Sequence, residues 1–150
     1  AADGMLAPFN HGSEGENPYT IQHELQDTMH NLVGIIRTES ELKEAQGKVV
    51  EYQARAEHAG VEGHRQYNPG WHLSMDLQSM LIVSEAISRA AEMRKESRGG
   101  HTRDDYPGPD PEWGKLNVVV RRGEGGEMQL AAEPLPQMPE ELQALFEEAH

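Results

Sequence analysis

The densest group of side chains that could do chemistry lies in a short charged loop between Glu96 and Asp105. A histidine oriented by a carboxylate can act as a general base, so His101 with Asp104 or Asp105 is one candidate for catalysis. No serine elbow accompanies this histidine, and the loop identifies no nucleophile. We therefore predict no catalytic residue here. We expect instead a corner of ion pairs and hydrogen bonds that locks the loop and docks it on a neighbour.

Five residues of this loop are the candidates for docking: Arg98, His101, Arg103, Asp104 and Asp105. The planar guanidinium groups among them bind through several hydrogen bonds at once, so lysine would be a poor replacement. The two tryptophans, Trp71 and Trp113, are expected to anchor a core or an interface rather than to form a substrate platform.

Metal and phosphate sites are the other possibilities. Eight histidines are present, and His23, Asp27 and His30 would share one side of a helix. No HExxH or paired Glu-x-x-His pattern accompanies them, so we predict solvated surface and no metal site. The Gly99-Gly100 pair would end a helix and Gly123 would start a turn, whereas a phosphate cradle opens a helix. We predict no cofactor-binding residue in this chain.

Composition limits the class of protein. The 150 residues carry a formal net charge of −13, which argues against general binding to nucleic acid or to an anionic membrane surface. A hydrophobic content of 36% with 5% aromatic residues indicates a modest, mainly aliphatic core. The lack of cysteine excludes disulfides and thiolate metal sites, and it fits a reducing compartment. No apolar run is long enough to span a bilayer, so direct membrane insertion is not expected.

Apolar residues at three- and four-residue intervals predict three helices. They span residues 18–37, 38–59 and 72–98. Asn17-Pro18 and either Thr38 or Ser40 can cap the first two helices, and Gly99-Gly100 can end the third. Similar lengths and short connections favour an antiparallel bundle. Residues 1–17 are rich in glycine and polar residues, and we expect a flexible linker there.

The signals change after Pro107, where closely spaced prolines exclude a helix. Leu116–Arg121 has the β-branched content of a strand, and Met128–Ala132 would pair with it as a hairpin. Glu140–Glu148 is expected to form a short acidic helix. The predicted fold class is mainly α: an antiparallel three-helix bundle followed by a small β-hairpin and a short C-terminal helix, with residues 18–150 as a single domain.

Three separate motifs add a family resemblance. Residues 96–107, ESRGGHTRDDYP, resemble the E-S-R-G-x-H-x-R-x-D-[FY] segment in the C-terminal part of the flavoprotein subunit of succinate dehydrogenases and fumarate reductases. Residues 25–38 look like that family's L-Q-x-x-M-x-x-x-[VA]-G-[IV]-x-R helix, and Trp113-Gly114-Lys115 resembles the opening of its next strand. The resemblance covers residues 18–132 and adds Arg37 and Trp113 to the docking candidates. Leu116-Asn117 departs from the His-Thr found in many members.

The resemblance implies a parent protein larger than this chain, and the start at Ala1 without an initiator Met agrees with a fragment. In the family, a separate FAD-binding domain and a capping domain carry the flavin and the catalytic groups. The parent would interconvert succinate and fumarate, pass electrons to an iron–sulfur subunit, and serve electron transport and the tricarboxylic acid cycle. The parent is expected in the cytoplasm, peripheral on the inner face of the cell membrane through partner subunits. This fragment would be a scaffold that binds no FAD and is inactive alone.

Two alternatives stay open on the sequence alone. An L-aspartate oxidase-like flavoprotein would carry a similar V-G-[IV]-[IV]-R-T helix and a similar E-S-R-G-x-H segment, although Trp113-Gly114-Lys115 and the hairpin favour the succinate branch. The chain could also be a free-standing helical interaction module. Five of its 13 basic residues fall between Arg89 and Arg103, and this basic end of the third predicted helix would contact an acidic partner.

Overall fold

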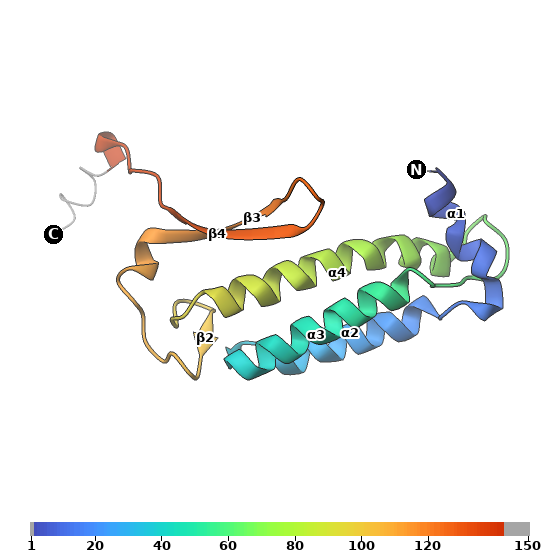
Figure 1. Ribbon diagram of the computed structural model, residues 1–150, viewed down its shortest axis with the longest axis horizontal. Coiled ribbons are helices and arrows are strands. Elements are labelled where there is room, and N and C mark those ends of the chain that lie inside the picture. The colour runs from blue at the N-terminus through green and yellow to red at the C-terminus, as the bar shows by residue number, and fades with distance from the viewer. Residues whose placement is uncertain (1, 143–150) are drawn as a thin grey trace.

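Three long helices lie side by side and form the body of the molecule in the computed structural model, which describes residues 2–142 (Figure 1). They are α2 (Pro18–Leu32), α3 (Glu39–Ala56) and α4 (Pro69–Met93), and each contacts the other two. Each begins at a polar cap: Asn17 accepts from Tyr19 N, Thr38 and Glu41 form a capping box, and Asn68 accepts from Trp71 N. The predicted antiparallel three-helix bundle is confirmed.

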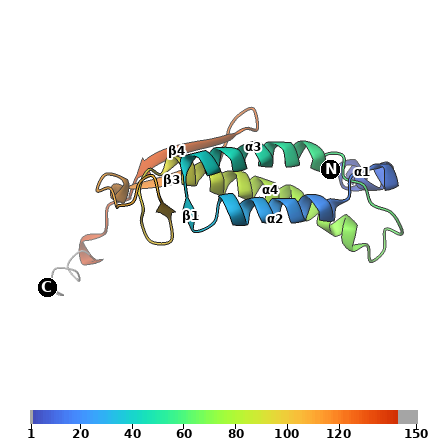
Figure 2. The same ribbon diagram turned by 90° about the horizontal axis from the view of Figure 1, so that it is seen from below.

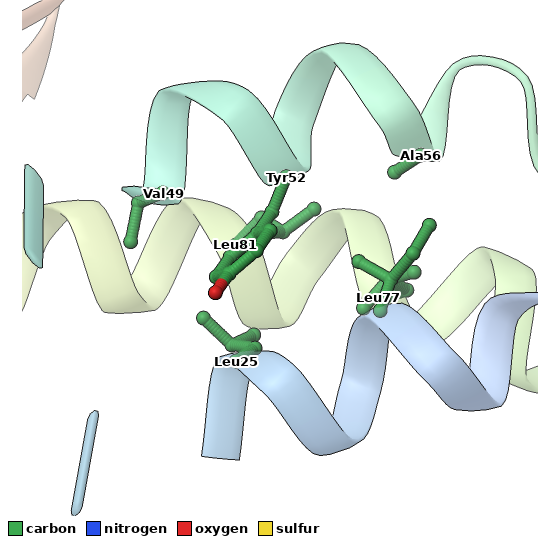
Figure 3. Packing of buried hydrophobic residues seen from close by; sticks show 7 residues of the cluster. Leu25, Val49, Tyr52, Ala56, Leu77 and Leu81 are labelled. Carbon is green, nitrogen blue, oxygen red and sulfur yellow. The ribbon is translucent and has the colours of Figure 1, made fainter. Parts of the chain in front are cut away.

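The core between the helices is aliphatic, as the composition predicts. Its main cluster takes residues from all three helices (Figure 3): Ile21, Leu25, Val49, Tyr52, Ala56, Leu77 and Leu81. The one aromatic member, Tyr52, satisfies its hydroxyl against Thr28 Oγ1 at 3.0 Å. A second cluster lies nearer the end of α4 and contains Val33, Leu42, Ala45 and Ala91.

The end of α4 differs from the prediction, because the helix stops at Met93 and not at Gly99-Gly100. Arg94 is already extended, with φ −80° and ψ 101°. The guanidinium of Arg103 donates to the carbonyls of Ala91 and Glu92 and so satisfies groups that a further helical turn would have used. Gly99 has φ +58° and lies in a turn of the following loop.

Residues 2–14 also differ from the prediction of a flexible linker. They form the helix α1 (Ala2–His11) and the 3-10 helix η1 (Gly12–Glu14). Trp71 at the start of α4 holds them, because its Nε1 donates to Met5 O at 2.6 Å and its ring lies 5.5 Å from that of Phe9. This tertiary contact overrides the weak helical propensity of a segment that contains Gly4, Pro8 and Asn10.

A close backbone crossing follows α1. Gly60 N donates to Glu16 O at 2.8 Å, and Glu16 N donates to His58 O at 3.0 Å. A Cβ atom on Gly60 would lie 2.2 Å from Gly12 O and 2.7 Å from Gly15 Cα. Only glycine therefore lets the start of the chain lie against the end of α3.

The predicted hairpin is present. Strand β3 (Leu116–Arg122) pairs antiparallel with β4 (Met128–Pro134), and Val120 lies opposite Leu130. The hairpin contacts α4 and lies on the side of it away from α2 and α3 (Figure 1). A helical segment starts at Glu140, and the remainder of the predicted terminal helix, up to Glu148, lies outside the described residues. No helix within residues 2–142 is both long and apolar enough to cross a membrane.

The glycine crossing yields a stability prediction. Gly60→Ala should lower the free energy of unfolding by about 2–3 kcal/mol, because the new methyl group forces two backbone segments apart. Gly47→Ala is the control: Gly47 lies inside α3 with nothing within 4 Å, so alanine should raise stability by about 1 kcal/mol through helix propensity. Urea unfolding followed by circular dichroism measures both. If Gly60→Ala left the free energy of unfolding unchanged, the two backbone segments could not lie as close together as described.

Candidate functional site

The loop after α4 folds back onto the connection between α2 and α3. Strand β1 (Ile36–Arg37) pairs in parallel with β2 (Thr102–Arg103), and Asp104 N donates to Arg37 O at 2.9 Å. The two strands lie beside each other at one end of the bundle (Figure 2). We call the loop 94–107 together with Ile36–Arg37 the corner. Ile36, which the sequence placed on the first helix, is outside α2 and 61% exposed, because Arg37 Nε donates to the carbonyls of Val33 and Gly34 where α2 ends.

Arg103 is the centre of the corner and is fully buried. Its Nε and Nη2 donate to both oxygens of Asp105, at 2.8 and 2.7 Å, while Nη1 donates to the carbonyls of Ala91 and Glu92 at 2.9 and 3.1 Å. The hydrogen bond from Arg103 lowers the pKa of Asp105 to about 2. Asp105 Oδ2 also accepts from Glu39 N at 2.9 Å. One ion pair therefore joins the end of α4 to the start of α3.

A buried carboxylate, that of Glu96, was missed by the sequence analysis. It is fully buried and accepts from Arg94, from Arg98 Nε at 3.0 Å and from Asp110 N at 2.8 Å. These contacts, that of Arg98 first, lower its pKa to about 2. The signal was an acidic residue with an arginine two positions away on each side, but only the extended backbone after α4 turns all three side chains together.

His101 is a bridge between segments. Its Nδ1 lies 2.8 Å from Arg37 Nη1, which can only donate, and its Nε2 lies 3.0 Å from the carbonyl of Arg94, which can only accept. These partners select the neutral ring with its proton on Nε2. Burial, and then the charges of Arg37, Arg103 and Arg94, lower the pKa of His101. Both ring nitrogens are occupied by partners other than Asp104 or Asp105, so the geometry does not support a general base.

The remaining candidates lie at the edge of the corner. Trp113 is half-buried in the 3-10 helix η2 (Trp113–Lys115), and its ring lies 5.3 Å from the guanidinium carbon of Arg94. Arg98 keeps 46% of its side chain exposed, and Asp104 is exposed. Arg37, His101, Arg103 and Asp105 hold the corner together through their hydrogen bonds, although Asp105 is itself exposed. Arg98 and Asp104 are exposed and Trp113 is half-buried.

The corner is less basic than the sequence indicates. Arg94 and Arg98 pair with Glu96, and Arg103 pairs with Asp105. This internal pairing offsets part of the positive charge on which the hypothesis of a basic module that contacts an acidic partner relied. The structure thus brings six of the seven docking candidates, all but Trp113, into the corner, and most of their hydrogen bonds run inside the molecule.

The other candidate sites stay apart. His23, Asp27 and His30 are all exposed on α2. Within residues 2–142, no three His, Asp or Glu side chains gather closely enough to hold a metal ion.

Comparison with known proteins places the chain in a family. Residues 22–144 match the family model described as the C-terminal part of the fumarate reductase flavoprotein. The chain belongs to this family. Two of the three motifs that carried the resemblance meet directly in space, because Arg37 binds His101. The third is held beside them by Arg94, just before the second motif, which donates to the carbonyl of Trp113.

Named relatives agree with this assignment. A fumarate reductase flavoprotein subunit of Mycobacterium tuberculosis is 32% identical over 126 residues, which are 83% of this chain and 22% of that protein. A succinate dehydrogenase flavoprotein subunit of Coxiella burnetii is 29% identical over 125 residues, which are 82% of this chain and 21% of that protein. Our chain thus spans about a fifth of the length of these relatives. They support the succinate dehydrogenase and fumarate reductase branch over the L-aspartate oxidase-like alternative.

Solved structures share the fold. Sdh1 of Mycobacterium smegmatis, solved in complex with UQ1, is 44% identical with a TM-score of 0.87, over 97% of this chain and 25% of that one. A quinol fumarate reductase FrdA chain of E. coli, 24% identical, has a TM-score of 0.79 over 92% of this chain and 24% of that one, which shows a common fold alone. The chain is therefore the C-terminal domain of a succinate dehydrogenase or fumarate reductase flavoprotein subunit.

The buried Arg103 network gives a prediction. Arg103→Lys should lower the free energy of unfolding by roughly 3 kcal/mol, because an ammonium group cannot bind both Asp105 oxygens and the carbonyls that end α4. Arg121→Lys is the matched control, since Arg121 also binds a carboxylate, that of Glu133, through two nitrogens, but on the exposed hairpin. Arg121→Lys should lower the free energy of unfolding by less than about 1 kcal/mol. Equal losses in urea unfolding would show that the burial of Arg103 does not matter.

His101 gives a prediction about pH. Because the folded state lowers its pKa below 6.5, the unfolded chain takes up the proton first as the pH falls. The stability contributed by neutral His101 should be complete above about pH 6.5 and be lost towards the lowered pKa, with a slope of at most about 1.4 kcal/mol per pH unit. Stability from Glu96 and Asp105 is lost in a separate, more acidic window, below their ordinary pKa values and towards about 2.

Variants separate this effect from general acid sensitivity. His101→Gln can still accept from Arg37 and donate to the Arg94 carbonyl, so it should fold and show a flatter stability profile between pH 7 and pH 5. His23→Gln, at an exposed position of α2, should keep the profile of the unmodified chain. If His101→Gln showed the same dependence of stability on pH as the unmodified chain, His101 would not be the cause of that dependence.

Proposed function

We propose that this chain is the scaffold domain of a flavoprotein that interconverts succinate and fumarate. The observation that carries the proposal is the family match over residues 22–144, together with relatives that are named for these two activities. In the parent, the chemistry would be hydride transfer between the dicarboxylate and FAD, with electrons passed to an iron–sulfur subunit. The part that this chain supplies is mechanical: it folds into a rigid body and holds the other domains in place.

The flavin would be held by the rest of the parent. FAD needs a glycine-rich turn that opens a helix and presents N–H groups to the diphosphate. Among the described residues, Gly123–Gly126 instead closes the hairpin, and both α2 and α4 begin at an Asn-Pro cap. These residues do not fit FAD, so we derive no step of the reaction from them.

The exposed surface supports docking on a larger body. The chain exposes 9999 Å², whereas a folded monomer of 16.7 kDa is expected to expose about 7,600 Å². Part of the excess belongs to residues 135–142, all of which are exposed. The whole difference is larger than the roughly 800 Å² that one partner buries in a standard interface. We propose that the parent's FAD-binding and capping domains cover this surface.

The corner would then be a rigid docking site for the neighbouring domains. Arg37, His101, Arg103 and Asp105 fix its shape, while Arg98, Asp104 and Trp113 are proposed to contact the neighbouring domains. We further propose that the parent is cytoplasmic and peripheral on the inner face of the cell membrane, attached through partner subunits.

A substitution at Arg98 tests the docking role in the full-length parent. Arg98→Ala should reduce the ratio of bound FAD to protein and lower the melting temperature of the parent more than that of the isolated 150-residue chain. The reason is that Glu96 keeps Arg94 and Asp110 N as partners inside the domain, whereas an external contact would have no substitute. Arg121→Ala, on the exposed hairpin, is the control and should change neither quantity appreciably. Equal loss of melting temperature in both contexts with FAD retained would argue against docking by Arg98.

A further inference from the structure

The ring of His101 links the loop after α4 to the connection between α2 and α3. Its Nδ1 lies 2.8 Å from Arg37 Nη1, and its Nε2 lies 3.0 Å from the carbonyl of Arg94. Nδ1 must be the acceptor of the first contact, because a guanidinium group can only donate. A proton on Nδ1 would point one donor at another, so the contact with Arg37 requires a neutral ring.

The charges that act on this ring are positive. They come from each segment around it: Arg37 on β1, Arg103 on β2, and Arg94 directly after α4. Together with burial, these charges disfavour the protonated form of His101. Both hydrogen bonds of the ring also go to arginines, to the side chain of Arg37 and to the carbonyl of Arg94.

The carboxylates of the corner are directed at other groups. Glu96 pairs with the arginines on either side of it in the sequence, and Asp105 pairs with Arg103. Asp104 is exposed, and both ring nitrogens of His101 have other partners. A proton on His101 would therefore add a positive charge next to arginines, and its Nδ1 would lose its hydrogen bond.

The pairing of β1 with β2 has little other support. The connection between α2 and α3 carries Ile35 and Ile36, which are 74% and 61% exposed, so apolar burial adds little. Beyond the two-residue ladder, Asp104 N donates to Arg37 O at 2.9 Å. The Nε of Arg37 binds carbonyls of its own connection and so does not reach the loop. The contact between Arg37 and His101 thus ties the connection to the loop.

The rest of the corner does not depend on this proton. Arg103 binds Asp105, and Asp105 Oδ2 accepts from Glu39 N. The pKa of Asp105 is about 2, so this ion pair stays charged at a pH at which a histidine titrates. The bundle has its own aliphatic core. Loss of the contact between Arg37 and His101 therefore affects the pairing of β1 with β2 before it affects the helices.

We propose that His101 is a proton-controlled latch: when its ring is protonated, the α2–α3 connection separates from the loop after α4, while the helical bundle and the buried Arg103–Asp105 pair stay in place. The opening is local and does not require the domain to unfold. In the open form the ring regains the ordinary pKa of a histidine, near 6.5, and in the closed form its pKa is lower. The open form therefore takes up the proton first, and opening increases as the pH falls below about 6.5.

Hydrogen–deuterium exchange of the full-length parent, read by mass spectrometry, tests the latch. Exchange is measured at pH 7.5 and pH 5.5, with labelling times scaled to the intrinsic exchange rate at each pH. A peptide with the Asp104 amide, which binds Arg37 O, reports on the β1–β2 pairing, and a peptide with Val49, buried on α3, reports on the bundle. The corrected exchange of the first should rise about 3- to 10-fold at pH 5.5, because one pH unit below the ordinary pKa changes a proton-linked equilibrium at most about tenfold. That of the second should not change.

Two variants assign the response to His101. His101→Gln can still accept from Arg37 and donate to the carbonyl of Arg94, but it takes up no proton, so the Asp104 peptide should exchange alike at both pH values. His23→Gln, at an exposed position of α2, should keep the full response.

Each other outcome overturns the proposal. Unchanged exchange of the Asp104 peptide would mean that the pairing does not open. Equal acceleration of the Val49 peptide would mean that the whole domain unfolds. A response that persists in His101→Gln would have another origin. If His101→Gln fails to fold, the pH at which exchange starts to rise in the unmodified parent decides: near 6.5 agrees with the latch, whereas a rise only below about 4.5 would belong to carboxylates and contradict it.

Discussion

The buried guanidinium of Arg103 is the interaction on which the corner depends. Its charge is balanced by Asp105, and its remaining N–H groups bind the carbonyls at the end of α4. Asp105 in turn binds the first N–H of α3. A buried charge tolerates few arrangements, because each polar group left unpaired in a low-dielectric interior is costly. This one side chain thus decides where α4 ends, where the loop turns back, and how the loop meets α3.

Polar and apolar surfaces have separate tasks in this domain. In the corner, arginines and carboxylates pair with one another, which makes the corner rigid and offsets part of its positive charge. On α4, Ile82, Val83 and Ile87 have the opposite character, since they are exposed aliphatic side chains. Rigidity therefore comes from charged groups that bind one another, whereas these three side chains have large exposed apolar areas. In an acidic chain with a net charge of −13, an uncharged face is where a neighbouring domain can pack without charge repulsion.

The features that could be predicted from the sequence are those that depend on residues close together in the chain. The helices and their caps at Asn17, Thr38 and Asn68 depend on residues within one turn of each other, and the hairpin depends on a short glycine-rich turn. The errors all come from distant contacts. Arg103 ends α4 from ten positions beyond its last residue, and Trp71 folds α1 from about sixty positions away. Likewise, strands of two residues carry no periodic signal, and Glu96 looks like a surface acid until the backbone leaves the helix.

The parallel pairing of β1 with β2 has a consequence for the newly made chain on the ribosome. Asp105 and Glu39 are 66 residues apart, so two of the three long helices must emerge in full before the first can be tied to its neighbour at this end. Contacts of such range close late because the loop entropy has to be overcome first. Until then α2, α3 and α4 contact one another only along their lengths, through the aliphatic core and through hydrogen bonds such as that from Gln46 to Glu92. The segment that joins α2 to α3 is not yet held by the corner. The corner can therefore form only after Asp105 has been made, although Arg37 and Glu39, with which the loop 94–107 pairs, are made early.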